Sequence, residues 1–304
     1  MDYFLGIDGG GSQTTFLLGD ETGVLASMQA AGSNPTRVGE EQTCSALQQG
    51  IDQICHRRGI NPEQIVALCA GIAGAARDEV RQTIARALSQ SVAGRVAVVG
   101  DMVIAHEAAL GGAPGIIVLC GTGSMAYGRH QSGRTARAGG WGFAISDEGS
   151  GHWIGVQAVS AVTRALDSGS DTGLRDRILK RWHLDSYDEL IAHANALSAA
   201  KFSALFDVVL SAAEAGDSYA HHILVQAGSE LARLAEVVFR RLWQSDDVVG
   251  FAMAGGVFQH ASVVRESLHR ELHTFLPQAS IFLSTKNPAE GALALARKLA
   301  AVQP

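Results

Sequence analysis

The chain has 304 residues, 47% of them hydrophobic and 18% charged, with a net charge of −6, and this length supports about two domains. The acidic balance without a long basic stripe argues against a nucleic-acid partner; early acidic residues argue against a signal peptide, and no apolar run reaches the roughly 18 residues that span a membrane. The four cysteines form no C-x-x-C pair, so we expect reduced thiols in a cytoplasmic protein.

The first stretch with clear chemistry is a glycine turn between two strands. An apolar run leads into Asp8, the turn contains Gly9, Gly10, Gly11 and Ser12, and strand residues resume at Thr14. Adjacent glycines let the backbone approach a ligand closely, and the N–H groups of such a turn suit a phosphate. Asp8 could hold a hydrated Mg²⁺ beside that phosphate. The alternative is a plain hairpin with a solvated Asp.

Strands and helices then alternate up to a glycine-rich break at 111–115, which we interpret as a domain boundary. Asp101 follows a short buried strand, where α/β sheets place ligands. It is either a general base for a substrate hydroxyl or an N-cap of the next helix. The predicted strands are 3–8, 14–19, 23–30, 65–70 and 96–99, and the predicted helices are 40–58, 78–90 and 103–110.

The second half repeats this opening. A buried strand at 116–120 precedes Gly121, Thr122, Gly123 and Ser124. Of these, Gly121, Gly123 and Ser124 correspond to Gly9, Gly11 and Ser12 at a constant offset. Two such halves suggest a duplicated fold with a cleft between them. The same glycines could belong to a dinucleotide-binding fingerprint, but that motif needs a helix directly after Ala126, where further glycines follow instead.

The remainder is mainly helical and ends with two more strands. The strand at 248–254 runs into Gly255 and Gly256, a pair that could hold the flat face of a nucleobase or simply allow close strand-to-helix packing. Strands that alternate with helices predict an α/β fold. The predicted helices are 151–166, 174–182, 187–197, 202–214, 218–243, 259–275 and 288–301, and the last strand is 280–283.

Residues 138–155 concentrate glycines, an aromatic residue and two carboxylates before a helix. Gly140 permits close approach, Trp141 could wall the apolar face of a ligand, and Asp147 could bind hydroxyl groups. The alternative is a turn-rich loop in which Asp147 or Ser150 caps the helix.

Five motifs in this order resemble those of the actin/Hsp70/sugar-kinase superfamily. They are Asp8–Ser12, Gly100-Asp101, Gly121–Ser124, Ala254–Gly256 and Glu290–Ala292. Within that superfamily, Gly139–Gly142 followed by Asp147–Ser150 is similar to the N-acetylglucosamine kinases, the bacterial glucosamine kinases and the BadF/BcrA-type ATPases.

The resemblance implies a two-domain, duplicated actin-like ATPase (ribonuclease H-like) fold. The first domain would comprise 1–114, completed by the last helix at about 288–304. The second would comprise 115–287, with a helical insert at about 151–243. It further implies ATP and Mg²⁺ as cofactors, a small hexosamine as substrate and no nucleic acid or membrane partner, and the helical region leaves surface for a homodimer.

The implied reaction transfers the γ-phosphoryl group of ATP to the 6-hydroxyl of N-acetylglucosamine or glucosamine. Asp101 would be the catalytic base and Asp8 the metal residue. The implied ATP-binding residues are Gly9, Gly10, Gly11, Ser12, Thr14, Gly121, Thr122, Gly123, Ala254, Gly255 and Gly256. The implied sugar-binding residues are Asn34, Gly71, Asp101, Ser124, Gly140, Trp141 and Asp147.

Two departures from the family pattern leave the choice of sugar open. Met125 stands where Asn is frequent among the relatives, and Gly100 stands where Asn is common. The cysteines are not clustered for an iron–sulfur centre, which disfavours the reductase-activator branch. The alternative function is a nucleotide-switched ATPase or a sugar sensor that does not phosphorylate sugar.

Overall fold

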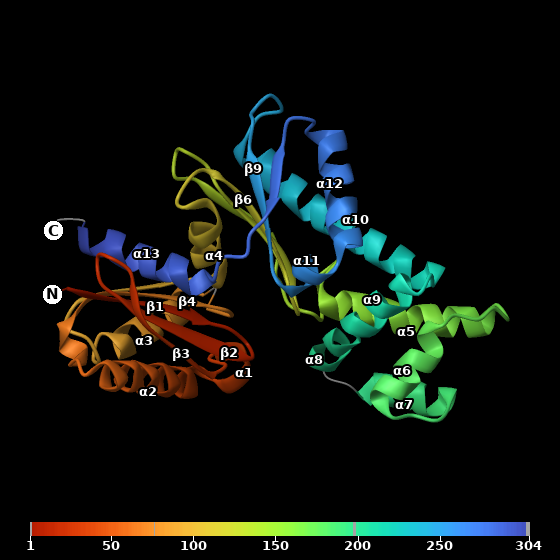
Figure 1. Cartoon of the computed structure of the whole chain (residues 1–304), viewed down its shortest axis with the longest axis horizontal. Coiled ribbons are helices and arrows are strands. Elements are labelled where there is room, and N and C mark those ends of the chain that lie inside the picture. Colours follow the sequence, from red (N-terminus) through yellow and green to blue (C-terminus); the bar gives the residue numbers. More distant parts are fainter. Residues whose placement is uncertain (1, 76, 197–198, 302–304) are drawn as a thin grey trace. The chain divides into compact units, whose positions relative to one another are not determined.

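The structure is a computed structural model that describes residues 2–75, 77–196 and 199–301. Strands and helices alternate along the chain (Figure 1), which confirms the predicted α/β class. The internal contacts divide the chain into two compact units. The first consists of Met1–Ala113 with Thr285–Pro304, and the second consists of Pro114–Ser284.

The first unit is built on a five-stranded sheet with the order β3-β2-β1-β4-β5. The first three strands are antiparallel neighbours, whereas β4 and β5 run parallel to β1. The carboxyl ends of β1, β4 and β5 therefore meet at one edge of the sheet. The strands are β1 (Tyr3–Gly9), β2 (Gln13–Gly19), β3 (Val24–Ala31), β4 (Ile65–Ile72) and β5 (Arg95–Val99).

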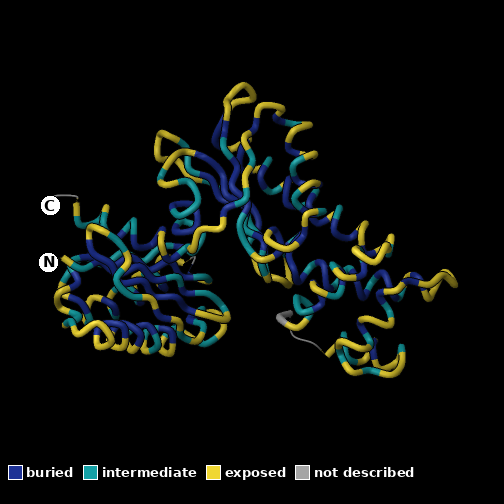
Figure 2. Tube along the Cα trace, viewed as in Figure 1, coloured by how far each residue is buried: buried dark blue, intermediate teal, exposed yellow. Residues whose placement is uncertain are grey.

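Helices cover both faces of this sheet. One core joins the strands to α2 and α3, and a second core joins the opposite face to α4 and α13. Burial is accordingly densest along the strands, while the outer helix surfaces are exposed (Figure 2). The helices are α1 (Pro35–Val38), α2 (Glu40–Arg58), the 3₁₀ turn η1 (Pro62–Gln64), α3 (Asp78–Leu88), α4 (Asp101–Leu110) and α13 (Pro288–Ala301).

The C-terminal helix α13 packs directly on the first strand because small residues let the backbones approach. A Cβ atom on Gly6 would lie only 2.4 Å from the backbone nitrogen of Leu293. A Cβ on Gly291 would lie 2.0 Å from the carbonyl oxygen of Ile104 in α4. Any larger side chain at these two glycines would push α13 away from the layer that supports Asp101.

The second unit repeats the same sheet, with the order β10-β9-β6-β7-β8. The strands β6, β7 and β8 pair antiparallel to one another, as β1, β2 and β3 do in the first unit. The strands β9 and β10 run parallel to β6. The matching strand order confirms the duplicated fold that the sequence predicts. The strands are β6 (Gly115–Cys120), β7 (Ser124–Arg129), β8 (Thr135–Gly139), β9 (Gly250–Ala254) and β10 (Ser280–Leu283).

A single core joins this second sheet to the helices of its unit. Two of the predicted helices are wrong as continuous segments. The segment at 202–214 forms three short pieces, and the one at 259–275 is broken at Ala261, whose backbone is extended. The predicted 187–197 helix ends at Ala196, and position 197 lies outside the described residues. The helices are α5 (Gly151–Asp167), α6 (Leu174–Trp182), α7 (Tyr187–Ala196), α8 (Ala199–Phe202), η2 (Ser203–Leu205), α9 (Phe206–Glu214), α10 (Ser218–Leu242), α11 (Gly256–His260) and α12 (Ser262–Phe275).

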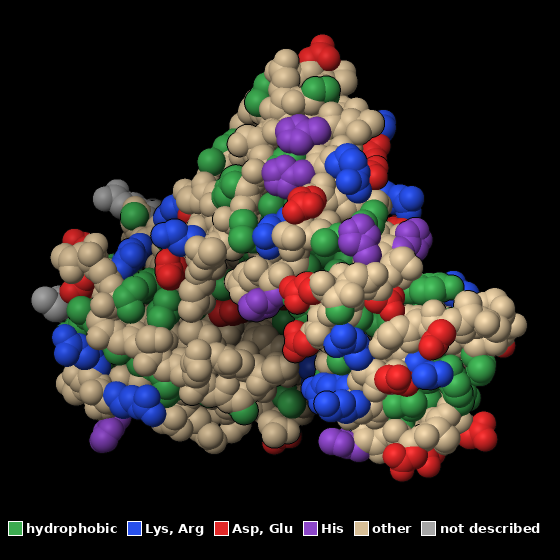
Figure 3. Space-filling view, turned by 45° about the vertical axis from the view of Figure 1, so that its right-hand side comes forward, with side chains coloured by type: hydrophobic (Ala, Val, Ile, Leu, Met, Phe, Trp, Pro, Cys, Tyr) green, Lys and Arg blue, Asp and Glu red, His purple; other side chains and the backbone are tan. Residues whose placement is uncertain are grey.

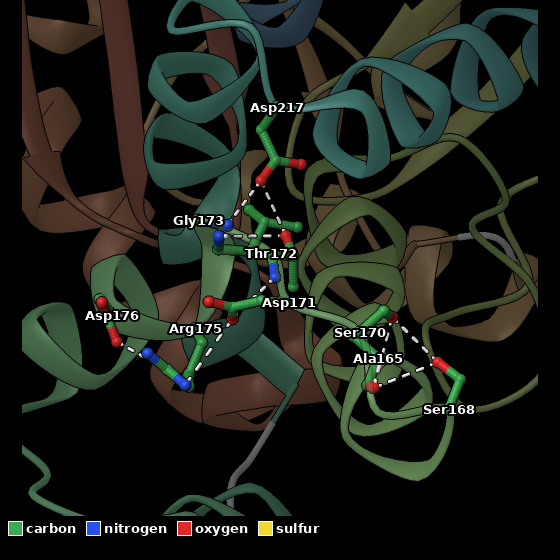
Figure 4. A network of polar contacts seen from close by, with 10 residues as sticks. Ala165, Ser168, Ser170, Asp171, Thr172, Gly173, Arg175, Asp176 and Asp217 are labelled. Atoms are coloured by element: carbon green, nitrogen blue, oxygen red, sulfur yellow. Dashed lines mark hydrogen bonds and ion pairs between the residues drawn. The ribbon is translucent and has the colours of Figure 1, made fainter.

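A polar network holds the loop before α6 to the start of α10 (Figure 4). Asp217 is the N-cap of α10 and accepts a hydrogen bond from Ala220 N–H at 2.9 Å. Its second oxygen accepts from the Thr172 hydroxyl at 2.8 Å and from Gly173 N–H at 2.7 Å. Burial opposes ionisation, but these hydrogen bonds prevail and lower the pKa of Asp217.

On the face seen in Figure 3, Lys and Arg side chains are interspersed with Asp and Glu. Among the described residues, none of the helices combines the length and the apolar character that a membrane crossing requires.

Candidate active site

Each unit gathers its own set of the predicted site residues. In the first unit, the set lies at the carboxyl ends of β1, β4 and β5. Asp8 is paired in register with Gly71 on the neighbouring strand, and Gly71 with Val99, two residues before Asp101. Gly71 is buried, and a Cβ there would overlap the Ile104 side chain of α4. The topology thus brings Asp8 and Asp101 together at one sheet edge.

The glycine turn after β1 is closed by a hydrogen bond from Gly10 N–H to Gln13 O at 2.9 Å. In residues 2–75, 77–196 and 199–301, the backbone N–H groups of Gly11 and Ser12 donate no hydrogen bond. Free amides at the tip of a tight turn are the donors that an anion site requires. The turn is therefore suited to a phosphate through Gly11 and Ser12, whereas the amide of Gly10 is already used.

Thr14 lies beneath this turn and does not reach its surface. The residue is only 1% exposed, and its hydroxyl is hydrogen bonded to Ala31 O at 2.8 Å and to Ser33 Oγ at 2.9 Å. Ser33 N–H in turn donates to Gly10 O at 3.0 Å. In this structure, Thr14 thus supports the shape of the turn from below.

Asn34 is the N-cap of α1. Its side-chain oxygen accepts hydrogen bonds from the backbone and hydroxyl of Thr36, at 2.9 and 2.6 Å. That oxygen also lies 2.4 Å from where a Cβ of Gly74 would stand, so Asn34 packs against the loop that follows β4. In the described part of the chain, the side-chain NH₂ group of Asn34 donates no hydrogen bond, so it can serve as a donor to a ligand.

Asp101 is the first residue of α4 and not its N-cap, a position that Gly100 occupies without a side-chain hydrogen bond. The Asp101 carboxylate accepts a hydrogen bond from Met102 N–H at 3.0 Å. Burial raises the pKa of Asp101, and this hydrogen bond opposes the rise only in part. A buried carboxylate with a raised pKa is a good proton acceptor for a hydroxyl group.

Asp8 and Asp101 interact directly through their charges. Burial, together with the repulsion from Asp101, raises the pKa of Asp8 from 3.8 to about 6. Two carboxylates that repel one another are stabilised by a shared cation, and Mg²⁺ typically takes one or two carboxylates together with substrate phosphates. The donor set beside the glycine turn therefore fits Mg²⁺.

In the second unit, the matching turn is held by the segment before α5. Gly121 N–H bonds to Gly123 O at 2.9 Å, and Gly121 O accepts from Gly151 N–H at 2.9 Å. The Ser124 hydroxyl donates to Glu148 O at 2.7 Å, so it supports the loop in this structure. Within the described part of the chain, the N–H groups of Thr122 and Gly123 donate no hydrogen bond, as at the first turn.

Asp147 stands against this second turn in a conformation that few non-glycine residues adopt. Its φ is +72°, the residue is 8% exposed, and its carboxylate accepts a hydrogen bond from Ser124 N–H at 3.3 Å. Burial raises the pKa of Asp147. Strained backbone at a buried carboxylate is typical of functional sites. In this structure, the Asp147 carboxylate faces the Gly121–Ser124 turn.

The segment after β9 joins the same group. Gly255 has a φ of +109°, and a Cβ there would lie 2.3 Å from Cys120 O at the end of β6. The neighbouring Ala254 pairs in register with Leu119, and Gly256 begins α11. The glycine pair therefore packs on the strand that leads into the second turn.

The glycine-rich loop after β8 carries Trp141 on the surface. Trp141 is 63% exposed, and the Arg137 guanidinium lies 4.1 Å from the centre of its ring. Gly140 has a φ of +69° and packs against Met125. The contact with Arg137 orients one face of the indole and leaves the other free for a ligand.

The strand β7 after Gly121–Ser124 excludes the dinucleotide-binding alternative, which required a helix there. Sequence reasoning missed one residue at the first turn, Arg37, whose Nη1 donates to Gly11 O at 3.4 Å. Its only signal in the sequence is a cation three residues after Asn34, which is too weak to single out a site residue.

Comparison with known proteins agrees with this arrangement. Residues 5–296 match the BadF/BadG/BcrA/BcrD ATPase family. The chain belongs to this family. It is 34% identical to an N-acetylmuramic acid/N-acetylglucosamine kinase of Clostridium acetobutylicum, over 98% of this chain and 99% of the relative. It is also 28% identical to an N-acetyl-D-glucosamine kinase of Dictyostelium discoideum, over 97% of this chain and 98% of the relative.

A solved structure from Chromobacterium violaceum, described as a candidate N-acetylglucosamine kinase, shares the fold. It superposes with a TM-score of 0.80 at 27% identity, covering 97% of this chain and 98% of that one. The two repeated sheets thus form the duplicated actin-like ATPase fold that the motif order predicts.

Proposed function

We propose that this chain is an ATP-dependent amino-sugar kinase that transfers the γ-phosphoryl group to the 6-hydroxyl of N-acetylglucosamine or glucosamine. The observation that carries the proposal is the pair of equivalent glycine turns with free amide groups, one of them beside Asp8 and Asp101. Full-length relatives that carry kinase names support it.

In this proposal, Asp101 receives the proton of the sugar 6-hydroxyl. The hydroxyl oxygen forms a bond to the γ-phosphorus, the bond from that phosphorus to the β–γ bridging oxygen breaks, and ADP leaves. Phosphoryl transfer depends mainly on alignment and charge stabilisation, so one carboxylate base is sufficient. The raised pKa of Asp101 suits it to accept a proton.

In the first unit, the free amides of Gly11 and Ser12 would bind phosphate, and in the second unit those of Thr122 and Gly123 would do so. Asp8 would hold Mg²⁺, which neutralises phosphate charge when bound. We propose that Thr14 acts only through the shape of the first turn, because its hydroxyl is buried. Ala254, Gly255 and Gly256 would approach the adenosine.

We propose that the sugar-binding residues are Asn34 and Gly71 of the first unit and Ser124, Gly140, Trp141 and Asp147 of the second. An exposed indole face stacks on the apolar face of a pyranose, while amide and carboxylate groups bind its hydroxyls. The name of the Clostridium acetobutylicum relative adds N-acetylmuramic acid to the substrates worth testing.

We also propose a cytoplasmic location, since the four cysteines are free thiols, and a homodimer formed through the helical second unit. The location can be checked by fractionation, and the oligomer by sedimentation.

A coupled ADP-release assay tests the function. The panel comprises N-acetylglucosamine, glucosamine, N-acetylmannosamine, glucose and N-acetylmuramic acid, each with ATP and Mg²⁺. We expect turnover that depends on an amino sugar. ATP hydrolysis at the same slow rate with and without every sugar would instead indicate a nucleotide-switched ATPase. Sugar binding without turnover would indicate a sensor.

A further inference from the structure

The side chain of Arg37 lies on the first glycine turn although its element is far from β1 in the sequence. Arg37 belongs to α1, and its Nη1 donates to Gly11 O at 3.4 Å. A Cβ on Gly11 would lie 3.0 Å from Nη1, 3.2 Å from Cζ and 3.3 Å from Nε of Arg37. These nearly equal distances mean that the guanidinium plane lies against Gly11.

This contact contributes little to folding. Arg37 is exposed, and a donor–acceptor distance of 3.4 Å is longer than that of an ordinary N–H···O bond. Within residues 2–75, 77–196 and 199–301, Arg37 makes no ion pair. An arginine has five N–H donors, and the hydrogen bond to Gly11 O uses one of those on Arg37.

The Arg37 guanidinium lies at the same turn whose free amides suit a phosphate. It touches the backbone of Gly11, and the free amides that suit a phosphate are those of Gly11 and Ser12. A planar guanidinium binds phosphate through two parallel hydrogen bonds, which a lysine ammonium cannot reproduce.

We infer that Arg37 is a catalytic residue that binds the transferring phosphoryl group at the Gly11–Ser12 turn. This inference rests on the proposed kinase function, and it adds the Arg37 guanidinium to the groups that would bind phosphate. During transfer, negative charge spreads over the equatorial phosphoryl oxygens, and a fixed guanidinium stabilises that charge. Because Asn34 is the N-cap of the short α1, this helix would couple the placement of Arg37 to the proposed sugar-binding residue Asn34.

The variants Arg37→Met and Arg37→Lys test this role, with Arg57→Met as the matched control. Arg57 is an exposed arginine in the last turn of α2. With N-acetylglucosamine as acceptor, we expect R37M to lower kcat about 10²–10³-fold, the usual effect of losing one transition-state donor. The sugar KM and the melting temperature should change little. R37K should recover only part of the loss, and R57M should match the unaltered protein.

A second acceptor distinguishes the phosphoryl group from another anion. If Arg37 binds the transferring group, R37M should lower kcat similarly with neutral N-acetylglucosamine and with anionic N-acetylmuramic acid. A loss confined to the acidic sugar would assign Arg37 to the sugar carboxylate and overturn the inference. Unchanged kcat in R37M with an active parent enzyme would also overturn it. An inactive parent enzyme would instead refute the kinase function itself.

Discussion

The carboxylates of Asp8 and Asp101 lie close enough at one edge of the first sheet that the charge of Asp101 helps raise the pKa of Asp8 to about 6. The parallel pairing of β1, β4 and β5 creates this relationship, because it places the two strand ends side by side. Of the two carboxylates, Asp101 begins a helix and Asp8 precedes the glycine turn. This division suits Asp101 for proton transfer and Asp8 for a metal ion.

Replacement of Asp101 by Asn should lower kcat at least ~10²-fold, because the amide cannot accept the hydroxyl proton. The Asn side chain still accepts a hydrogen bond from Met102 N–H, so folding and ATP affinity should be retained. Calorimetric titration with ATP and steady-state kinetics measure the two effects separately. Asp52→Asn, on the exposed face of α2, is the control. Unchanged kcat in D101N would show that Asp101 is not the catalytic base and only begins α4.

The raised pKa of Asp8 predicts a pH dependence of stability and of Mg²⁺ binding. Because the folded-state pKa of about 6 lies above the ordinary value of 3.8, this group's contribution to the free energy of unfolding falls as pH rises from about 4 to about 6. The loss amounts to at most about 3 kcal/mol. In Asp8→Asn, the melting temperature should therefore be higher at pH 7.5 than in the parent protein without metal.

Mg²⁺ should restore the stability that the parent protein loses when Asp8 ionises. Because the metal binds the ionised carboxylate, it should raise the melting temperature more at pH 7.5 than at pH 5. D8N should show no such difference. An equal Mg²⁺ effect at both pH values, or an equal effect in D8N, would show that Asp8 does not hold the metal.

Trp141 should report sugar binding directly, since its ring is exposed in the ligand-free protein. We expect Trp141→Ala to raise the sugar KM about tenfold, equivalent to about 1.4 kcal/mol of binding free energy, with little change in kcat. Sugar should alter the intrinsic fluorescence of the parent protein but not of Trp141→Phe. The buried Trp243, replaced by Phe, is the control. A full fluorescence response in W141F would place the sugar elsewhere.

Asp217→Ala should destabilise the helical part of the second unit. The variant loses the cap of α10 and the bonds to Thr172 and Gly173, and loss of a cap alone costs about 0.5–2 kcal/mol. Because the pKa of Asp217 is lowered in the folded state, its stabilisation is present above the ordinary pKa and is lost as pH falls. Denaturant unfolding of D217A and the exposed control Asp207→Ala, at pH 7 and pH 3, measures this. An equal deficit at both pH values would contradict the assignment.

The sequence predicts the sheets well because their signals are local. Apolar runs that end at Asp8 and Cys120, each followed by glycines, specify strand and turn without tertiary information. The break of the predicted helix at Ala261 has no such signal, because neither Gly nor Pro stands there. It depends on how α11 and α12 pack within their unit.

The candidate site was predictable where it follows from strand ends and less so where side chains reach across the fold. Asp8 and Asp101 are neighbours because parallel strands end together, which topology alone implies. The burial of Thr14 depends on its contacts with Ala31 and Ser33. The contact of Arg37 with Gly11 depends on a long side chain and joins residues that are twenty-six positions apart in the sequence.

The reaction product distinguishes phosphorylation of the sugar 6-hydroxyl from hydrolysis of ATP. The protein should be incubated with ATP, Mg²⁺ and N-acetylglucosamine or glucosamine, and the mixture followed by ³¹P NMR. We expect ADP together with a phosphomonoester whose proton coupling places the phosphate on carbon 6 of the sugar. Release of inorganic phosphate alone, or a phosphate on another sugar oxygen, would contradict this expectation.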